Sequence, residues 1–336
     1  MGPASENIPD PRMGPASENI PDPRMGSASE HTRPTNGSGI GEGLNIVSIT
    51  PTVNIEPPPG TDEGEKRARA LQRGDHFTQV SSHYETFREL DIRAVHIISE
   101  VLAVAINQRC PVVRLLDVGT GEGRYLNAVS GSLPASLANR VLPIGVDLSP
   151  AMLTQAHVRN SHVGLGAQYL VSASEELPFL TASCDAVTSF NAVHHFDLAR
   201  FVSEASRVLI PSGQLVIYTR TPEQNRRTIW GRYFPEFATR ETKLYRRSDL
   251  QLALQAGGVF DSIRVQMIPW KVTTSLSRLI EQVVHFHYST FRLYSNDFLH
   301  EAIDTFEYCV RQEFSDMERI TFDNDHIMLL AKRASS

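Results

Sequence analysis

Cysteine is scarce in this sequence of 336 residues, which has only Cys110, Cys184 and Cys309. The number is odd, the spacing is wide and no C-x-x-C pair occurs. These features support neither a disulfide framework nor a zinc site. We therefore expect three reduced thiols and no bound metal ion.

The sequence also lacks an apolar run of about 18 residues, so it predicts no transmembrane helix. Its N-terminus has no basic region followed by an apolar region, which is the pattern of a secretory signal. A cytoplasmic location is the resulting expectation.

Positive charge is not in excess, because the formal net charge is -6. An acidic surface disfavours binding to a phosphate backbone, so a small molecule is a better candidate partner than nucleic acid. Hydrophobic residues make up 41% of the chain and charged residues 21%, a composition that allows a sizeable globular core. The sequence gives no indication of an oligomeric state.

The N-terminal region is repetitive. Residues 1–12 read MGPASENIPDPR, residues 13–24 repeat them, and Met25 opens a diverged third copy. Such a segment, rich in Pro, Gly, Ser and Glu, cannot bury enough apolar surface to offset its ordering entropy. We therefore predict a disordered tail over residues 1–74 and a folded domain over residues 75–336.

Apolar strand-like runs alternate with helical patterns from about residue 75 onwards. The predicted strands are 112–118, 141–146, 168–171, 185–190 and 214–219, followed by 262–268 and 326–331. This alternation predicts an α/β fold with a doubly wound, mostly parallel sheet that has helices on both faces. Residues 270–322 contain helical spacing and are too many for a turn, so they predict a helical insertion over one end of the sheet.

A glycine-rich loop follows the first predicted strand, in the run LLDVGTGEG at residues 115–123. Glycines allow a tight turn and close approach of a ligand to the backbone. The spacing is G-x-G-x-G, and Arg124 stands where a dinucleotide-binding fingerprint has its third glycine. Asp117 beside the loop would repel a pyrophosphate and attract a cationic amino group. A second acid, Asp147, ends the next strand, where a carboxylate can hold a ribose diol.

Five segments together resemble a known family. They are LLDVGTGEGRYL, GVDLSPAML, EELPF at 175–179, CDAVTSFNAVHHF at 184–196 and RVLIPSGQLVIY at 207–218. In this order, over roughly residues 75–270, they resemble class I S-adenosylmethionine-dependent methyltransferases, particularly those of ubiquinone and menaquinone biosynthesis. The resemblance implies a seven-stranded Rossmann-like sheet closed by an antiparallel C-terminal hairpin, and S-adenosyl-L-methionine as cofactor.

The resemblance also implies a role for each residue of the glycine loop. Asp117 would help hold the amino group of the cofactor. The residues beneath its methionine part would be Gly119, Thr120, Gly121 and Gly123.

Two further segments are implied to hold the nucleoside part of the cofactor. Asp147 would bind both ribose hydroxyls, with Leu148 and Met152 packing nearby. Ser174 and Glu175 lie in the segment that would border the adenine.

The sequence departs from the family at one position of the adenine segment. Ala173 stands where the family often has an aspartate for the adenine amino group, so that group would fall to Ser172, Ser174 or backbone atoms. Asn191, after the fourth strand, is expected to touch the cofactor through its backbone. Tyr84 would be a lid over the cofactor, as a tyrosine of an N-terminal helix often is in this family.

The loop after the fourth strand carries the candidate catalytic residues His194 and His195. One of them could act as a base, since imidazole titrates near neutral pH, or both could simply shape the pocket. Arg220, after the fifth strand, could pair with an acidic group of a substrate or be solvated or salt-bridged. The aromatic segments 230–237 and 285–288 are candidate walls of an acceptor pocket or parts of the core.

The leading hypothesis is an enzyme that transfers a methyl group from S-adenosylmethionine to an O, N or C atom of a small molecule. One alternative is a nicotinamide-dependent oxidoreductase on a related fold, which Arg124 disfavours. A second is a protein that binds S-adenosylmethionine without catalysis and regulates a partner.

Overall fold

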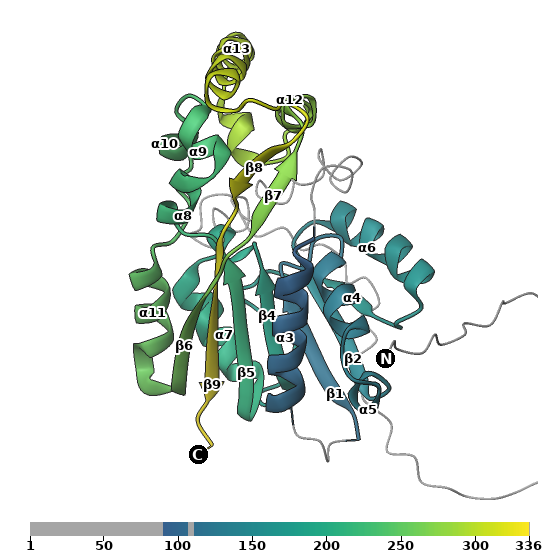
Figure 1. Ribbon diagram of the computed structural model, residues 1–336. Helices are drawn as coiled ribbons and strands as arrows, with labels where there is room; N and C mark the ends of the chain where they lie inside the picture. The colour runs from purple at the N-terminus through teal and green to yellow at the C-terminus, as the bar shows by residue number, and fades with distance from the viewer. Residues whose placement is uncertain (1–89, 107–110, 336) are drawn as a thin grey trace, which may run out of the picture. The chain divides into compact units, whose positions relative to one another are not determined.

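The computed structural model describes residues 90–106 and 111–335, and in it seven strands form one sheet in the order β3-β2-β1-β4-β5-β9-β6 (Figure 1). The strands are β1 Val113–Val118, β2 Val141–Asp147, β3 Gln168–Val171, β4 Cys184–Phe190, β5 Leu209–Thr219, β6 Phe260–Ile268 and β9 His326–Arg333. Neighbouring strands from β3 to β5 are parallel. β9 pairs antiparallel with both β5 and β6.

The order of the strands creates a crevice at one edge of the sheet. The chain passes from β1 outwards to β2 and β3, then returns to place β4 on the other side of β1. The carboxyl ends of β1 and β4 therefore flank a topological switch point, where open α/β sheets bind their ligands. β4 is buried at all seven positions, as expected for a strand covered on both faces.

Helices cover both faces of the sheet. α3, α4 and α5 share an apolar cluster with alternate residues of β1, such as Val113 and Leu115, and α6 lies beside α4. α7 and α11 pack on the opposite face against Leu116 and Val118, because successive side chains of a strand point to opposite faces. These helices are α3 Ile92–Ala105, α4 Arg124–Gly131, α5 Ala135–Ala138, α6 Pro150–Val163, α7 Leu198–Val208 and α11 Arg247–Gln255.

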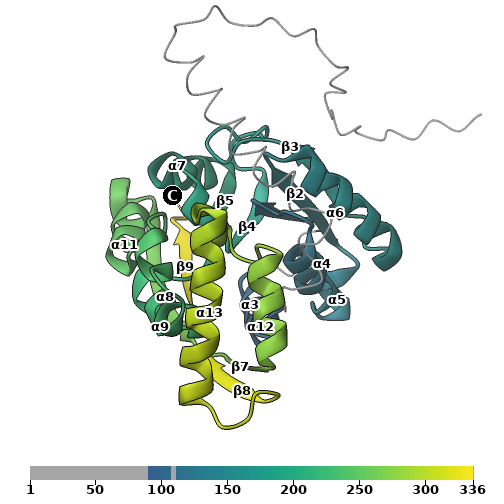
Figure 2. The same cartoon turned by 90° about the horizontal axis from the view of Figure 1, so that it is seen from above.

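A second layer, which we call the helical cap, lies beyond the edge of the sheet (Figures 1 and 2). It consists of residues 222–240 and 271–323. Its elements are α8 Pro222–Arg227, α9 Ile229–Tyr233, α10 Phe237–Arg240, β7 Lys271–Thr274, α12 Leu276–Val284, η3 Ser289–Leu293, α13 Asn296–Glu313 and β8 Ile320–Asp323. Two remaining 3-10 turns are η1 Val193–His195 and η2 Ala256–Gly258.

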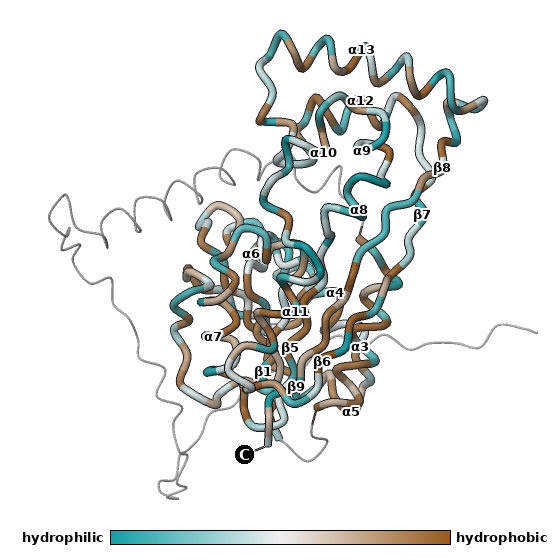
Figure 3. The backbone as a smooth tube through the Cα atoms, turned by 90° about the vertical axis from the view of Figure 1, so that its left-hand side faces the viewer, coloured by the Kyte–Doolittle hydropathy of each residue, from teal (hydrophilic) through white to brown (hydrophobic). Residues whose placement is uncertain are grey.

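The cap has an aromatic core of its own. Trp230 is 2% exposed, stacks on Phe306 at 5.0 Å between ring centroids and meets Phe291 edge-on at 5.2 Å. Along α13 hydrophobic and hydrophilic residues alternate (Figure 3), and Leu299, Phe306 and Val310 form the buried stripe. The offset and edge-on arrangements are those that aromatic pairs prefer.

The predicted α/β fold is confirmed, including the parallel strands, the antiparallel pair of β6 and β9, and the helical insertion. Three features differ from the prediction. The insertion is bounded by an unpredicted two-stranded sheet of β7 and β8, and residues 222–240 share its apolar core. β5 begins at Leu209, where residue 214 was predicted. The predicted tail over residues 1–74 and the domain boundary at residue 75 lie outside the described residues.

Candidate functional site

A cavity of about 250 Å³ lies between the sheet and the helical cap. Its sheet side is formed by the segments that follow β1, β2, β3, β4 and β5, and its other side by residues of the cap. The carboxyl ends of the parallel strands and the cap thus line one continuous pocket.

The glycine loop lies at the floor of this pocket. The N–H groups of Gly119 and Thr120 both donate to the carbonyl of Val146, at 2.8 and 3.0 Å, which ties the loop to the end of β2. Gly119 has a φ of +71°, and a Cβ placed there would lie 2.5 Å from the Cβ of Ala192. Only glycine fits this position, because the loop both turns left-handed and touches the segment after β4.

The carboxylate of Asp147 holds the other side of the glycine loop by hydrogen bonds to backbone N–H groups. Its Oδ2 accepts from the N–H of Gly121 at 2.8 Å, and its Oδ1 accepts from the N–H of Ser149 at 2.9 Å. Burial raises the pKa of this carboxyl, although these N–H groups act in the opposite direction. A carboxylate offers about four lone-pair positions, so acceptor capacity remains for a ligand.

Asp117 is 1% exposed and lies at the end of β1. Burial raises the pKa of its carboxyl from 3.8 to about 7, and the charge of Asp147 makes a smaller contribution in the same direction. The hydrogen bond that Thr188 donates at 2.9 Å lowers the pKa and offsets part of this increase. A buried carboxylate with a raised pKa is a site that a cation would stabilise.

The raised pKa of Asp117 predicts a pH-dependent stability. A carboxyl whose folded-state pKa exceeds its unfolded-state value stabilises the fold below about pH 4, and the contribution is lost as the pH rises to about 7. At 1.36 kcal/mol per pH unit the loss is at most about 4 kcal/mol. In urea titrations without ligand, Asp117→Asn should therefore gain stability relative to wild type between pH 5 and pH 8. A difference that stays constant over this range would contradict the assignment.

The remaining predicted cofactor residues are brought to the same pocket. Leu148, Met152, Ser174, Glu175 and Asn191 all line it, as do Thr120 and Gly121. Gly123 is instead the N-cap of α4. Tyr84 lies outside the described residues.

Local structure explains how two of these residues are placed. Ser149 caps α6, because its hydroxyl accepts from the N–H of Met152 at 3.4 Å with Pro150 at the first helical position. Asn191 has a φ of +52°, a conformation that asparagine tolerates, and its N–H donates to the carbonyl of Tyr218 at 2.7 Å.

Comparison with known proteins agrees with this geometry. Residues 116–217 match the family model described as a methyltransferase domain. This segment of the chain is therefore similar to a methyltransferase domain. The match ends before the cap, so the family model describes the cofactor side of the pocket and not the cap side.

Similar proteins carry related names. A "Probable S-adenosylmethionine-dependent methyltransferase" of Mycolicibacterium smegmatis is 37% identical over 121 residues, which are 36% of this chain and 43% of that protein. A "Probable tRNA methyltransferase 9B" of Bos taurus is 30% identical over 126 residues, which are 36% of this chain and 24% of that protein. The chain thus spans less than half the length of either relative.

A solved structure has the same fold. It is a "Putative methyltransferase from antibiotic biosynthesis pathway" of Anabaena variabilis, with a TM-score of 0.55 and 22% identity, and it covers 73% of this chain and 98% of its own. Among the described residues no helix is long and apolar enough to cross a membrane. The cytoplasmic location stays a prediction.

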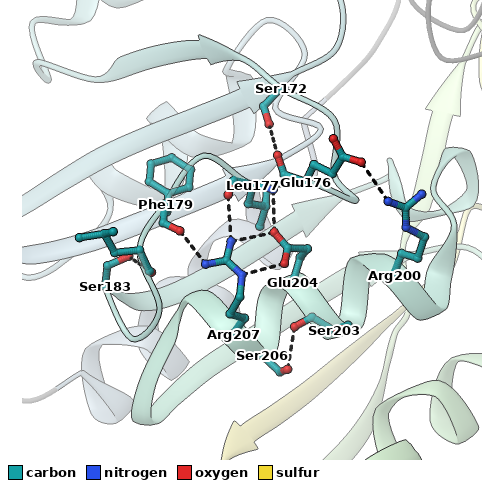
Figure 4. A network of polar contacts seen from close by, with 11 residues as sticks. Ser172, Glu176, Leu177, Phe179, Ser183, Arg200, Ser203, Glu204, Ser206 and Arg207 are labelled. Atoms are coloured by element: carbon teal, nitrogen blue, oxygen red, sulfur yellow. Dashed lines mark hydrogen bonds and ion pairs between the residues drawn. The ribbon is translucent and has the colours of Figure 1, made fainter. Parts of the chain in front are cut away.

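A polar network holds the segment after β3 in place (Figure 4). Arg207 of α7 donates to the carbonyls of Phe179 and Leu177 at 2.7 and 2.9 Å. It also pairs with Glu204 at 2.7 Å, which in turn accepts from the N–H of Leu177 at 2.8 Å. The pairing with Arg207 keeps the pKa of Glu204 below its usual value. α7 thereby clamps the chain that follows Ser174.

We expect Arg207→Met to lower the free energy of unfolding by about 1–3 kcal/mol, because two carbonyls and Glu204 lose a charged donor. Arg200→Met is the matched control, since its pair with Glu176 at 3.0 Å joins exposed side chains and should contribute less than about 1 kcal/mol. Urea unfolding of both variants measures the difference. Equal losses would show that the clamp has no special role.

The two candidate catalytic histidines face the pocket from η1. His194 and His195 both line it, with ring centroids 4.1 Å apart. Arg220 lines it as well and is 7% exposed. It is therefore not solvated, and no ion pair joins it to a carboxylate in the part of the chain that the structure describes.

The aromatic segments have two roles. Trp230 belongs to the core of the cap and also lines the pocket, whereas Phe234 and Phe237 are in the cap core alone. In the other segment, Phe286 and Tyr288 line the pocket.

Several residues that line the pocket were not predicted from the sequence. They are Asn225, Trp270, Asn324 and His326, among others. The last two follow β8 and begin β9, about 100 residues after Arg220 in the chain, so no local spacing links them. The only available signal was the predicted insertion, which placed the start of the last strand near the other strand ends.

Proposed function

We propose that this protein transfers the methyl group of S-adenosylmethionine to an O, N or C atom of a small-molecule acceptor. The observation that supports this best is a pair of acids, the buried Asp117 and the half-buried Asp147, on either side of the glycine loop in a pocket that continues under the cap. The resemblance to the ubiquinone and menaquinone subgroup is consistent with a small acceptor and stays a prediction.

The acids suit the two polar ends of this cofactor. Asp117, whose pKa is raised to about 7, would gain a counterion in the cationic amino group. Asp147 would use its remaining acceptor positions for the two ribose hydroxyls. The backbone at Gly121 leaves room for the ligand, since a Cβ placed there would meet only the end of the Met152 side chain at 3.7 Å.

The adenine would lie against the segment of residues 172–175. Ala173 provides no side-chain acceptor, and Glu175 accepts from the N–H of Asp197 at 2.8 Å. We therefore assign the adenine amino group to Ser174 or to backbone carbonyls of this segment.

S-adenosylmethionine supplies a methyl group that its sulfonium already activates. The contribution of the chain is to hold the acceptor in line with that group and to exclude water, which is worth up to about 7–11 kcal/mol in favourable cases. Where the acceptor loses a proton, His194 or His195 would receive it, since both line the pocket.

The net charge of -6 favours a small acceptor over a nucleic acid. The name of the bovine relative raises tRNA as a second acceptor class, but its similarity covers only 36% of this chain. Radiolabelled methyl transfer into a metabolite extract and into total tRNA separates the two. We expect label in the metabolites, and label in tRNA alone would replace the small acceptor.

Calorimetric titration of the full chain with S-adenosylmethionine, S-adenosylhomocysteine and NADH tests the cofactor. We expect micromolar binding of both sulfur compounds and none of NADH. Binding of NADH alone would overturn the proposal in favour of an oxidoreductase. Tight binding without any methylated product would favour the non-catalytic alternative.

A further inference from the structure

Arg220 is a buried charge on the acceptor side of the pocket. It directly follows β5 and is 7% exposed. A buried charge is costly unless a countercharge or a full set of hydrogen bonds compensates it. The partners of its guanidinium therefore indicate whether the protein itself completes the site.

Those partners are all uncharged or aromatic side chains. Nη2 donates to the Oδ1 of Asn324 and lies 3.5 Å from the Nε2 of His326. Nη1 donates to the hydroxyl of Tyr288 at 3.4 Å, whose ring centroid lies 5.5 Å from Cζ. Among residues 90–106 and 111–335, Nε has no hydrogen-bond partner and no carboxylate forms an ion pair with Arg220.

A second buried donor lies in the same pocket. Asn225 of α8 is 4% exposed, and its Nδ2 has no hydrogen-bond partner among the described residues. The nearby acid Glu241 accepts from the hydroxyl of Thr290 at 2.6 Å and from the N–H of Lys243 at 3.1 Å, and among the described residues it bonds to neither donor. Two buried donors with unused capacity thus belong to residues that line the cavity.

We propose that the methyl acceptor carries a carboxylate, which Arg220 binds together with the amide of Asn225. This inference rests on the proposed function, since it names the substrate class of the same pocket. A planar guanidinium matches a carboxylate, because two parallel N–H···O bonds can form. Trp230, Trp270 and Tyr288 would hold the apolar or aromatic remainder of the molecule.

A single negative charge suits this pocket better than two. Arg124 and Arg292 also line the cavity, but so do Asp117, Glu122, Asp147, Glu175 and Glu241. Acids therefore outnumber arginines, and a dianionic phosphate would meet more repulsion than a monoanionic carboxylate.

Tryptophan fluorescence can test the proposal. The chain has two tryptophans, and both line the pocket. The probes are benzoate, benzamide and phenyl phosphate, titrated into the full chain with and without saturating S-adenosylhomocysteine. We expect saturable quenching by benzoate, with an affinity on the order of tenfold to a hundredfold above that of benzamide, as for a hydrogen bond to a charged group.

Two variants act on the charge in different ways. Arg220→Met removes it, and Asn324→Asp places a carboxylate of almost the same shape on its Nη2. Both should abolish the preference for benzoate over benzamide, and the second retains a buried ion pair that preserves the fold. Arg226→Met is the control, because Arg226 is exposed and pairs with Glu223 at 3.5 Å, and it should bind benzoate as wild type does.

The outcomes separate this inference from the proposed function. If S-adenosylhomocysteine fails to bind wild type, the proposed function fails, while the probes still report on Arg220. The carboxylate proposal would be overturned if benzoate gave no saturable quenching of wild type or if benzamide bound equally well. It would also be overturned if both variants kept the preference for benzoate over benzamide. Stronger binding of phenyl phosphate would replace the carboxylate with a phosphate.

Discussion

Asp147→Ala should lower the affinity for S-adenosylmethionine by about 100-fold or more. Two hydrogen bonds to a charged acceptor would be lost, each worth about 1.5–3 kcal/mol. The variant also loses the acceptors of the N–H groups of Gly121 and Ser149, so the loop beneath the methionine part would no longer be held in register. Calorimetric titration measures the change.

Asp185→Ala is the matched control for this loss. Like Asp147, Asp185 accepts from a backbone N–H, that of Arg114 at 2.9 Å, and it is itself buried. It lies near the start of β4, at the opposite end of the strand from the pocket. Asp185→Ala should lose stability and keep its cofactor affinity. Equal cofactor affinity in both variants would rule out Asp147 as the ribose acceptor.

Gly119→Ala should lower the free energy of unfolding by about 2–5 kcal/mol. A left-handed conformation costs a residue with a Cβ about 1–2 kcal/mol, and overpacking adds about 1–3 kcal/mol. The overpacking arises because the new Cβ would lie 2.5 Å from the Cβ of Ala192 and 2.8 Å from the Cζ of Phe196. Relief of this contact would push the histidine segment away from the loop, so cofactor binding should also fall.

Alanine variants at two other glycines, compared by urea unfolding, distinguish the conformational cost from the overpacking cost. Gly131, within α4, has no positive φ, and a Cβ added there would meet no atom within 4 Å. Its replacement by alanine should therefore leave stability unchanged or raise it by about 1 kcal/mol or less. Gly164 has a φ of +72° and open space, so its replacement should cost only the conformational part. Losses of the same size in all three variants would contradict the close packing at Gly119.

Local sequence was enough to predict that the glycine loop and the two acids meet in one pocket. The glycine loop, Asp117 and Asp147 follow consecutive strands, and the carboxyl ends of parallel strands meet at one edge of a sheet. Once the strands were predicted, the meeting of these residues followed. The seven strands were predictable for the same reason, because each is a short apolar run bounded by turn or helix signals.

The acceptor side was not predictable in this way. Arg220, Tyr288 and Asn324 come from three separate segments, and only the folding of the cap brings them together. Trp230 shows the same limit, because its position suited either the core or the pocket wall and the structure places it in both. Side chains that are distant in sequence share no periodicity from which their contact could be inferred.

The sequence by itself therefore determined the fold class, the glycine loop and the two acids, since backbone turns and strand order depend on local residue types. Only the tertiary structure decided that Arg220 is buried without a countercharge among the described residues and that the cap completes the pocket. Burial and ion pairing depend on which distant side chains surround a group, and packing between the cap and the sheet sets that environment.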